Sequence, residues 1–521
     1  MKAFCYLFFL FIPLSSLSGQ SLIVRWESEK DVHREVVGAE SRRQLVPALH
    51  IEQINFANDE ALHLAANGLS QCTCVRALET NREIEFRTDP NDDLYGSEQG
   101  NLARAGFDRA WDLTAGGKTT DGKDIVVAIL DAGFDDEHND ISPNLWINPG
   151  EIAGDGLDND GNGYVDDVHG WNMISGNNNF PLNTHGTQVI GLLGAKGNNG
   201  RGVSGTNWDL KMMLLSINTI ADIVEAYGYI LAQRQLYNTT DGREGAFIVA
   251  TNASFGVEGS SCNEFEVWGG LYEDLGRAGV LTAASTANRP WDVDINGDMP
   301  TDCPTEFLIG VTNVGTDDRL YRSSAFGQDN VDLAAPGEDS YTTLTRGRYG
   351  PFGSTSAAAP YVTGAIALLY ATPCPTLQDR IKSDPSSAAL LIRDAVLSTT
   401  VANPSLTFRT ASGGIIDVAE AQRKLTESCD LGERAEFAIT AVRPNPASGQ
   451  ALLETNAIVF SESGRIDLYD AMGRRVRQQT AVRVGGVTVT LSLDLAGIPA
   501  GWYSIMVTER DRVARSVIVV R

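Results

Sequence analysis

The chain has few basic residues, few histidines and few cysteines, and it lacks a long apolar run after its first twenty residues. Lys and Arg number 41 against 67 Asp and Glu, so the formal net charge is −26 at pH 7. This balance argues against a basic surface for phosphate groups, and we expect no nucleic-acid partner. No segment has the roughly 18 uninterrupted apolar residues of a membrane helix, so we expect no transmembrane segment.

What is present is the composition of a globular protein. The 521 residues are 42% hydrophobic and 21% charged, with 52 Gly and 19 Pro. These values disfavour disorder, collagen-like repeats and coiled coil. The length is about three to four times that of a typical domain, so we expect two or three folding units.

The first residues have the layout of a secretory signal peptide. Lys2 precedes an apolar run over residues 3–14, and mostly small residues follow at 15–19. The run is too short to span a bilayer. An N-terminal core strand is the alternative, but Pro13 and the terminal position favour cleavage. We predict a signal peptide over residues 1–20 and an exported, soluble mature protein.

Export places the cysteines that follow Cys5 in an oxidising compartment, where disulfides form. Six cysteines allow fifteen pairings. We predict two pairs, because each brackets one stretch of the central region; free buried thiols are the alternative. The six residues are Cys72, Cys74, Cys262, Cys303, Cys374 and Cys429, and the predicted pairs are Cys262 with Cys303 and Cys374 with Cys429.

The apolar pattern changes twice along the chain. After the signal peptide, residues 21–95 combine strand-like and helical patterns with a polar, turn-prone exit, which predicts a small α+β unit. Residues 96–432 alternate β-rich apolar runs with helical patterns, which predicts an α/β fold with a parallel sheet covered by helices on both faces. Residues 433–521 show period-two alternation between turns, which predicts an antiparallel β-sandwich.

Three motifs place an acid, an imidazole and a hydroxyl where α/β sheets build their sites. Asp131 follows the apolar run 125–130, so its carboxylate is expected at the carboxyl end of a strand. His185 begins a predicted helix and faces the loop. Ser356 begins a buried helix, where free N–H groups favour a developing oxyanion. Taken singly, the three have ordinary alternatives: a surface turn Asp, a solvated or core His, and an N-cap Ser.

Together these motifs resemble those of the subtilisin family of serine endopeptidases. Asp131, His185 and Ser356 occur in this order, in the contexts Asp-x-Gly, His-Gly-Thr and Thr-Ser-x-Ala-x-Pro. Val-Asp-Leu-Ala-Ala-Pro-Gly at 331–337 is similar to a run that this family carries before the nucleophile. The resemblance covers about residues 97–430 and implies a subtilisin-like sheet. It also implies a triad in which Ser356 attacks, His185 transfers the proton and Asp131 orients the imidazole.

The same resemblance implies an amide donor for the oxyanion. Asn288 ends the run 281–288, which occupies the place where the family has this Asn. Ala287 stands where Gly is frequent, which bears on the geometry of this loop. Two further departures are Ala132, where Ser or Thr is usual, and Ser354, where Gly is usual; both are small, and we expect them to keep the chemistry.

A short segment after a predicted strand resembles the substrate-binding edge of subtilases. It consists of Ser254, Phe255 and Gly256. Backbone pairing with an extended peptide would supply affinity there, and side-chain pockets would supply selectivity. A plain buried strand end is the alternative.

Residues 155–167 place acidic or amide oxygens at alternate positions around turn-forming Gly residues, as oxygen-rich calcium loops do. His169 stands at the twelfth position from Asp158, where an EF-hand has Glu, and no flanking helix pair is evident. A solvated acidic turn is the alternative. If a structural calcium binds here, the expected ligands are Asp158, Asp160, Asn162 and Asp166.

The two flanking units resemble processed parts of secreted proteases. Residues 21–95 resemble subtilase propeptides in position, with cleavage expected near residues 88–95; a permanent N-terminal domain is the alternative. The motifs at 443–449, 468–474 and 494–503, with a basic end, resemble the type A sorting domain of the type IX secretion system. That resemblance implies passage across the outer membrane, then release or surface attachment. A carbohydrate-binding or adhesive sandwich is the alternative.

The sequence therefore predicts a secreted or surface-attached serine endopeptidase that hydrolyses protein or peptide substrates through an acyl-enzyme. No organic cofactor is expected, and the type IX secretion machinery is an expected partner. The alternative is a secreted pseudoprotease or surface adhesin that keeps the fold for binding. The presence of Asp131, His185, Ser356 and Asn288 argues against that alternative.

Overall fold

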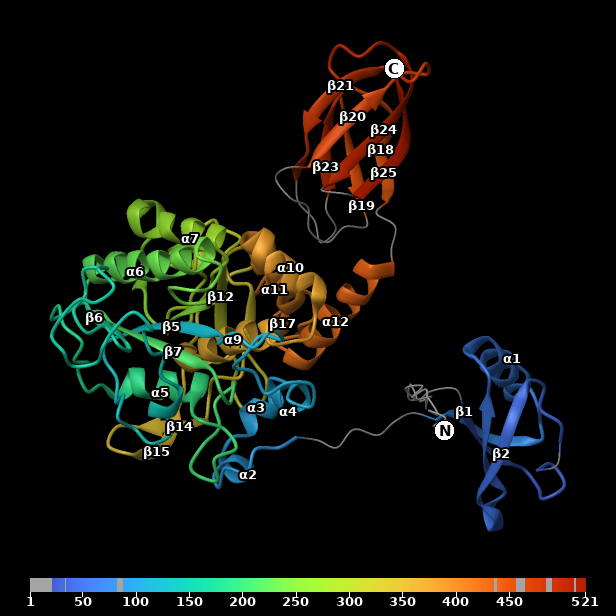
Figure 1. Cartoon of the computed structure of the whole chain (residues 1–521), viewed down its shortest axis with the longest axis horizontal. Helices are drawn as coiled ribbons and strands as arrows, with labels where there is room; N and C mark the ends of the chain where they lie inside the picture. The colour runs from blue at the N-terminus through green and yellow to red at the C-terminus, as the bar shows by residue number, and fades with distance from the viewer. Residues whose placement is uncertain are drawn as a thin grey trace, which may run out of the picture. The chain divides into compact units, whose positions relative to one another are not determined.

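The computed structural model describes residues 21–32, 34–81, 88–434, 438–455, 464–483, 490–509 and 512–521. The predicted signal peptide over residues 1–20 lies outside the described residues. The chain forms two compact units, divided between residues 86 and 87 (Figure 1).

The N-terminal unit is an antiparallel sheet with one helix, in the strand order β2-β3-β1-β4. Alternate residues of β1, including Leu22, Val24 and Trp26, are buried against Ile54 and the apolar side of α1. The side chain of Asn58 caps α1. This is the predicted α+β unit. Its elements are β1 (Ser21–Trp26), β2 (Ala39–Val46), η1 (Pro47–Leu49), β3 (Ile51–Phe56), α1 (Asp59–Ser70) and β4 (Val75–Thr80).

The second unit contains a nine-stranded sheet in the order β16-β17-β13-β12-β10-β8-β5-β7-β6. Neighbouring strands are parallel except β16 and β17. Because both faces are covered, the central strands are continuously apolar, as predicted. The strands are β5 (Val126–Asp131), β6 (Gly170–Asn172), β7 (Lys211–Ser216), β8 (Ile248–Ala253), β10 (Leu281–Ser285), β12 (Leu308–Asn313), β13 (Leu333–Ala335), β16 (Val401–Ala402) and β17 (Gly414–Ile415).

Helices cover the two faces of this sheet in two groups. Val127 and Ile129 of β5 pack into a core with α5, α9, α11 and α12, whereas Leu130 packs into a core with α6 and α7. In Figure 1, α6 and α7 accordingly lie on the opposite side of β5 and β7 from α5. The long helices are α5 (Thr184–Gly194), α6 (Ile220–Thr239), α7 (Glu266–Ala278), α9 (Thr355–Tyr370), α10 (Pro375–Ser383), α11 (Pro385–Ser398) and α12 (Val418–Arg434).

Short elements complete this α/β region. Strands β9 and β11 pair as an antiparallel ribbon, and β14 and β15 pair as an antiparallel hairpin; each pair is separate from the nine-stranded sheet. The short elements are α2 (Tyr95–Glu98), α3 (Gly100–Arg104), α4 (Phe107–Ala110), η2 (Ser142–Asn144), β9 (Val257–Glu258), η3 (Cys262–Glu264), α8 (Val293–Asn296), β11 (Asp298–Met299), β14 (Ser340–Leu344) and β15 (Arg348–Phe352).

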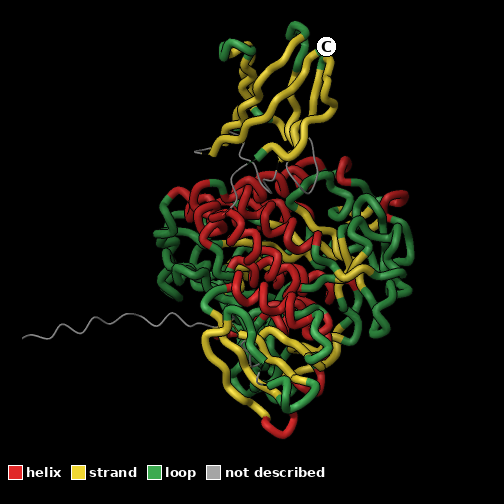
Figure 2. Tube along the Cα trace, turned by 90° about the vertical axis from the view of Figure 1, so that its right-hand side faces the viewer, coloured by secondary structure: helices red, strands yellow, loops and turns green. Residues whose placement is uncertain are grey.

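The C-terminal part consists of strands joined by loops, as Figure 2 shows. The strand order is β21-β20-β24-β25-β18-β19-β23-β22, with Leu453, Leu468 and Ile505 in its core. The pairings are antiparallel, as predicted, except that β18 pairs with β25 in parallel. The strands are β18 (Ile439–Ser448), β19 (Gln450–Thr455), β20 (Arg465–Tyr469), β21 (Arg475–Thr480), β22 (Val482–Arg483), β23 (Thr490–Asp494), β24 (Gly501–Glu509) and β25 (Arg512–Val520).

Three disulfides are present among the described residues. The two predicted pairs are confirmed, with Cα–Cα distances of 5.0 Å for Cys262–Cys303 and 5.5 Å for Cys374–Cys429. The third joins Cys72 to Cys74 in the N-terminal unit.

Within the described residues, no single helix has the length and apolar character needed to cross a membrane. In the part of the chain that the structure describes, one pair of helices, α9 and α10, passes that test together, bent by 100°.

Candidate active site

Asp131 and His185 are joined directly at the carboxyl end of the central sheet. Asp131 is the last residue of β5, and it is 5% exposed. Nδ1 of His185 lies 2.8 Å from Oδ2 and 3.0 Å from Oδ1 of Asp131. The carboxylate therefore holds the proton on Nδ1 and leaves Nε2 as the acceptor.

Two glycines let the loops that carry these residues approach each other. The side chain of Asn183 caps α5 by accepting from the N–H of His185 at 2.8 Å. A Cβ on Gly186 would lie 2.1 Å from the carbonyl oxygen of Gly133, the glycine of the Asp-x-Gly motif. The glycines of the two motifs thus permit the contact between Asp131 and His185.

The carboxylate also determines the acidity of the imidazole. Burial lowers the pKa of His185, but the hydrogen bond and the negative charge of Asp131 outweigh it, so the pKa is raised above 6.5. The ring of Phe352 contacts the imidazole edge to face, with centroids 5.6 Å apart. Asp131 therefore stabilises the cation that His185 would become on accepting a proton.

Ser356 lies at the second position of α9 and is 6% exposed. Helix α9 packs against α5, and Phe352, which contacts His185, precedes Ser356 by only four residues. Among the described residues, no hydrogen bond joins Nε2 of His185 to Oγ of Ser356. Such contacts commonly tighten only when substrate is bound.

Asn288 is tied to the residue that precedes Ser356. Its Oδ1 accepts from the backbone N–H of Thr355 at 3.2 Å and from the Thr355 hydroxyl at 3.0 Å. Because both partners are donors, the amide oxygen must face Thr355, and Nδ2 is left as a donor. The side chain of Asn288 is exposed.

Asp298 supports the loop that carries Asn288, and no sequence motif marks this residue. Its Oδ2 accepts from the N–H of Ala287 at 2.9 Å and from the hydroxyl of Thr301 at 2.8 Å. The carboxyl is 2% exposed, and burial raises its pKa to about 7 although both hydrogen bonds act in the opposite direction.

In the predicted substrate edge, residues 254–256, the side chains of Ser254 and Phe255 contact other residues of the protein, whereas the backbone N–H and C=O groups make no backbone hydrogen bonds among the described residues. Ser254 donates from Oγ to the carbonyl of Ser356 at 3.0 Å, Phe255 stacks on Trp268, and a Cβ on Gly256 would lie 2.4 Å from the carbonyl oxygen of Met299. Within the described chain, no backbone-to-backbone hydrogen bond engages residues 254–256.

Two of the predicted calcium ligands serve the backbone of their own loop. The carboxylate of Asp158 accepts from the N–H groups of residues 161–163. That of Asp166 accepts from the N–H groups of residues 154–156. These bonds explain why acidic residues stand at both positions without a metal.

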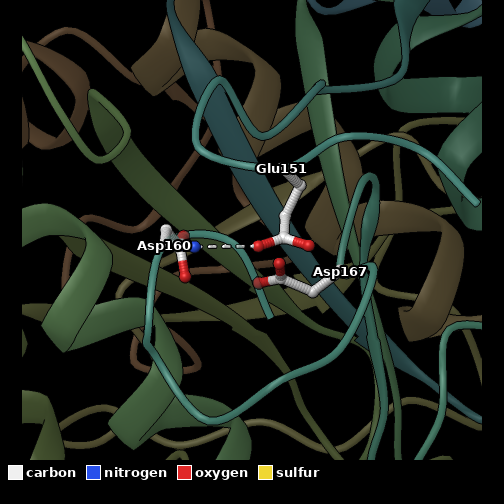
Figure 3. Close-up of side chains that lie close together, drawn as sticks. All are labelled: Glu151, Asp160 and Asp167. Carbon is white, nitrogen blue, oxygen red and sulfur yellow. Dashed lines mark hydrogen bonds between the residues drawn. The ribbon is translucent and has the colours of Figure 1, made fainter. Parts of the chain in front are cut away.

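The carboxylates that do come together belong to Glu151, Asp160 and Asp167, and Figure 3 shows them facing one another. One oxygen from each lies within 4.8 Å of the other two. The amides of Asn148 and Asn162 each donate to both Asp160 and Asp167. Of the predicted ligand set, Asp160 therefore belongs to this group and Asn162 borders it, whereas Asp158 and Asp166 do not belong to it.

The chemistry of this carboxylate group suits a hard cation. Asp167 is fully buried, and burial raises the pKa of its carboxyl; the charge of Asp160 raises it further, against hydrogen bonds from Tyr229, Asn162 and Asn148. Carboxylate oxygens are the preferred ligands of Ca²⁺. A bound cation would offset this repulsion, so the residues present fit the expected metal.

Comparison with known families matches two parts of the chain. The model of the Subtilase family matches residues 122–414, and the model of the Secretion system C-terminal sorting domain matches residues 441–521. The first match covers more than half of the chain.

Individual relatives are distant and mostly longer. Subtilisin-like protease 1 of Plasmodium falciparum (isolate 3D7) is 28% identical over 275 residues, which is 47% of this chain and 37% of the relative. Thermophilic serine proteinase of Bacillus sp. (strain AK1) is 28% identical over 312 residues, 57% of this chain and 65% of the relative. The alignments span only 37% to 51% of the Plasmodium proteins.

A solved structure described as proteases from Pseudoalteromonas arctica PAMC 21717 shares 25% sequence identity with the chain. It covers 65% of this chain and 100% of its own, with a TM-score of 0.46.

Proposed function

Because the chain belongs to the subtilase family of serine proteases, we propose that Asp131, His185 and Ser356 form its catalytic triad and cleave peptide bonds through an acyl-enzyme. The observation that carries this proposal is the hydrogen-bonded contact between Nδ1 of His185 and the buried carboxylate of Asp131.

In the proposed reaction, Nε2 of His185 takes the proton of the Ser356 hydroxyl as the oxygen attacks the scissile carbonyl. Asp131 stabilises the imidazolium, in line with the raised pKa of His185. The oxyanion receives hydrogen bonds from Nδ2 of Asn288 and from N–H groups at the start of α9. His185 then protonates the departing amine, and water releases the acyl group by the reverse sequence.

The proposal is tested with a general protein substrate. Ser356→Ala is expected to abolish hydrolysis while leaving the fold intact, because the side chain loses only its hydroxyl. The matched control is Ser383→Ala, at the exposed end of α10, where the hydroxyl bonds only within its own helix. Equal hydrolysis by the Ser356→Ala variant and the control would refute the triad.

We further propose that an extended substrate pairs with the free backbone of residues 254–256. The side chains support this edge from behind: Ser254 is tied to Ser356, and Phe255 is held on Trp268. A substrate strand placed there would run beside the nucleophile. Replacing the backbone N–H groups of a peptide inhibitor by N-methyl groups, one position at a time, is expected to weaken inhibition at alternate positions; no loss at any position would contradict the pairing.

We propose that Glu151, Asp160 and Asp167 hold a structural calcium ion. Bound calcium would supply positive charge to the carboxylates. The amides of Asn148 and Asn162, which donate to Asp160 and Asp167, would hold these two carboxylates in place. Glu151 accepts from the N–H groups of Asn159, Asp160 and Asp166, so it organises the loop as well.

The metal proposal predicts that chelation lowers the melting temperature and removes about one calcium per chain. Glu151→Gln, whose single amide oxygen can still accept from the N–H groups of Asn159 and Asp160, should reduce calcium content and the stabilisation by added calcium. Asp155→Asn is the control, because Asp155 lies in the same loop outside the carboxylate group. Unchanged metal content and melting temperature after chelation would contradict the proposal.

We also propose that the N-terminal unit is a propeptide. Residues just after it are anchored on the α/β region: Asp92 accepts from the N–H groups of Asn198 and Asn199, and Leu94 donates to the carbonyl of Gly202. A cut before Asn91 would leave these contacts in the mature enzyme. With cleavage expected near residues 88–95 and these contacts retained, N-terminal sequencing of the secreted protein is expected to start between residues 88 and 91; a start before residue 30, which retains the unit, would contradict a propeptide role.

The C-terminal domain is a secretion system sorting domain. A domain of this kind directs the chain to the cell surface or the extracellular space. We propose that the type IX secretion machinery is its partner. Deleting residues 441–521 is expected to retain the protein inside the producing cell, and secretion of the shortened chain at the normal level would contradict this assignment.

A further inference from the structure

The disulfide of the N-terminal unit closes a much shorter loop than the other two. Cys72 and Cys74 are two positions apart, whereas the other pairs are 41 and 55 positions apart. A crosslink restricts the unfolded chain less as its loop becomes shorter. The Cys72–Cys74 bond therefore contributes little to the free energy of unfolding.

The turn that carries this disulfide is held by backbone hydrogen bonds at both cysteines. It joins α1 to β4. The N–H of Glu27, just after β1, donates to the carbonyl of Cys74 at 2.9 Å, and the N–H of Val75 donates to the carbonyl of Cys72 at 3.1 Å. These bonds do not need the sulfur–sulfur bond. A reduced pair of thiols would stay in place, ready to close again.

The two sulfur atoms differ in access and in surroundings. Cys72 is partly exposed, whereas Cys74 is 6% exposed. The guanidinium of Arg34 lies 3.9 Å from Sγ of Cys72, and the N–H of Cys74 donates to the same sulfur at 3.2 Å. Arg34 also binds Asp31, which offsets part of its charge. Both donors favour a thiolate on Cys72, and stabilising the reduced form makes a disulfide a stronger oxidant.

An apolar cavity of about 420 Å³ lies beside the disulfide. Both cysteines line it, together with Trp26, Val36 and Leu64. Val36 and Trp26 are buried, whereas Leu64 is 64% exposed at the rim. An apolar side chain next to a reactive cysteine in a polypeptide would fit this cavity, which places that cysteine near the accessible sulfur.

We propose that Cys72 and Cys74 form a thiol–disulfide exchange site that oxidises a pair of cysteines in a reduced polypeptide. A substrate thiolate attacks Sγ of Cys72, the Cys72–Cys74 bond breaks, and Cys74 leaves and takes a proton. The second substrate thiolate then attacks the substrate sulfur of the mixed disulfide and expels Cys72 as a thiolate beside Arg34. Two electrons and two protons leave the substrate, one protein disulfide is reduced, and one substrate disulfide forms.

The first test measures the equilibrium of each disulfide with glutathione in the full chain, with Ser356→Ala preventing proteolysis. Defined mixtures of reduced and oxidised glutathione are followed by alkylation and peptide mapping. Cys72–Cys74 is expected to be reduced in mixtures on the order of 100-fold more oxidising than those that reduce Cys262–Cys303. Reduction of both at the same mixture, or of Cys262–Cys303 first, would overturn the proposal.

A variant pair separates an exchange site from a merely labile bond. Arg34→Gln is expected to make the Cys72–Cys74 pair a weaker oxidant by about threefold, because the thiolate loses a nearby cation. Arg43→Gln, an exposed arginine of β2 in the same unit, is the control and should leave the equilibrium unchanged. Equal behaviour of the two variants would contradict the role of Arg34 and with it the proposed mechanism.

The second test examines the predicted order of attack with a probe peptide that contains one disulfide. In Cys74→Ser, the accessible Cys72 is free and should form a persistent mixed disulfide with the peptide, detected by mass spectrometry. In Cys72→Ser, the buried Cys74 should form much less. Mixed disulfides in equal amounts, or none in either variant, would overturn the assignment of Cys72 as the exchanging residue.

Discussion

Ser354 adopts a backbone conformation that favours glycine, and replacing it by glycine should stabilise the enzyme. Ser354 precedes α9 and lies two residues before Ser356, with φ 72° and ψ −177°. This region is almost closed to residues that carry a Cβ and costs about 1–3 kcal/mol. Among the described residues, the hydroxyl of Ser354 makes no hydrogen bond that glycine would lose. Glycine costs about 0.5–1 kcal/mol through the greater entropy of the unfolded chain. Ser354→Gly should therefore raise the free energy of unfolding by up to about 2.5 kcal/mol.

The measurement is the urea midpoint of the unfolding transition of the α/β region, in a Ser356→Ala background that prevents self-digestion. Ser354→Ala is the matched control, because it removes the hydroxyl but keeps the Cβ, and it should leave the midpoint nearly unchanged. Equal midpoints for the glycine and alanine variants would show that the Cβ is not strained and would refute this reasoning.

Three further predictions concern pH and packing. Since the folded pKa of Asp298 is raised to about 7 from 3.8, the free energy of unfolding should fall by at most about 4 kcal/mol as pH rises between these values. In Asp298→Asn this fall should disappear, which urea unfolding at pH 4 and pH 8 would show. An unchanged pH slope would contradict the burial of this carboxyl. If His185 is the base of the proposed triad, it can act only when neutral, and its pKa is raised; kcat/KM should then rise with a midpoint above pH 6.5, and Asp131→Asn should lower both that midpoint and the rate. A midpoint unaffected by Asp131→Asn would argue against their coupling. Gly186→Ala should reduce kcat on the order of 100-fold, because its Cβ would displace the loop of Gly133, whereas Gly228→Ala, with open space around it, should be neutral.

The strands and helices of the α/β region were largely predictable because burial leaves a strong local signature. Residues 125–130 form one apolar run because β5 is covered on both faces. The cysteine pairs of the same region were predicted from their positions, and both form. In the C-terminal part, alternation indicated antiparallel strands, but the parallel pairing of β18 with β25 depends on long-range assembly that alternation does not encode.

The acidic loop shows where the sequence stops being informative. Asp158 and Asp166 have the spacing of calcium ligands, yet that spacing is also what a loop needs to satisfy its own N–H groups. Glu151 lies outside the repeating pattern and joins Asp160 and Asp167 only because the chain folds back. Acidic side chains can either accept from backbone N–H groups of their own loop or bind a metal. Residue order alone therefore does not tell which of these roles each carboxylate has.

Asp298 and Ser354 were hidden for related reasons. Asp298 acts through a hydrogen bond to Ala287, eleven residues earlier, and no local pattern marks that contact. Ser354 was visible as a departure from glycine, but only its positive φ shows that the departure strains the backbone.

The most direct test of the triad is covalent labelling of the processed enzyme with a fluorophosphonate, followed by mass spectrometry of the labelled peptide. Label is expected on Ser356 alone, with loss of labelling in His185→Ala, where no base remains to accept the hydroxyl proton. Label on another serine, or full labelling of Ser356 without His185, would contradict the proposed chemistry.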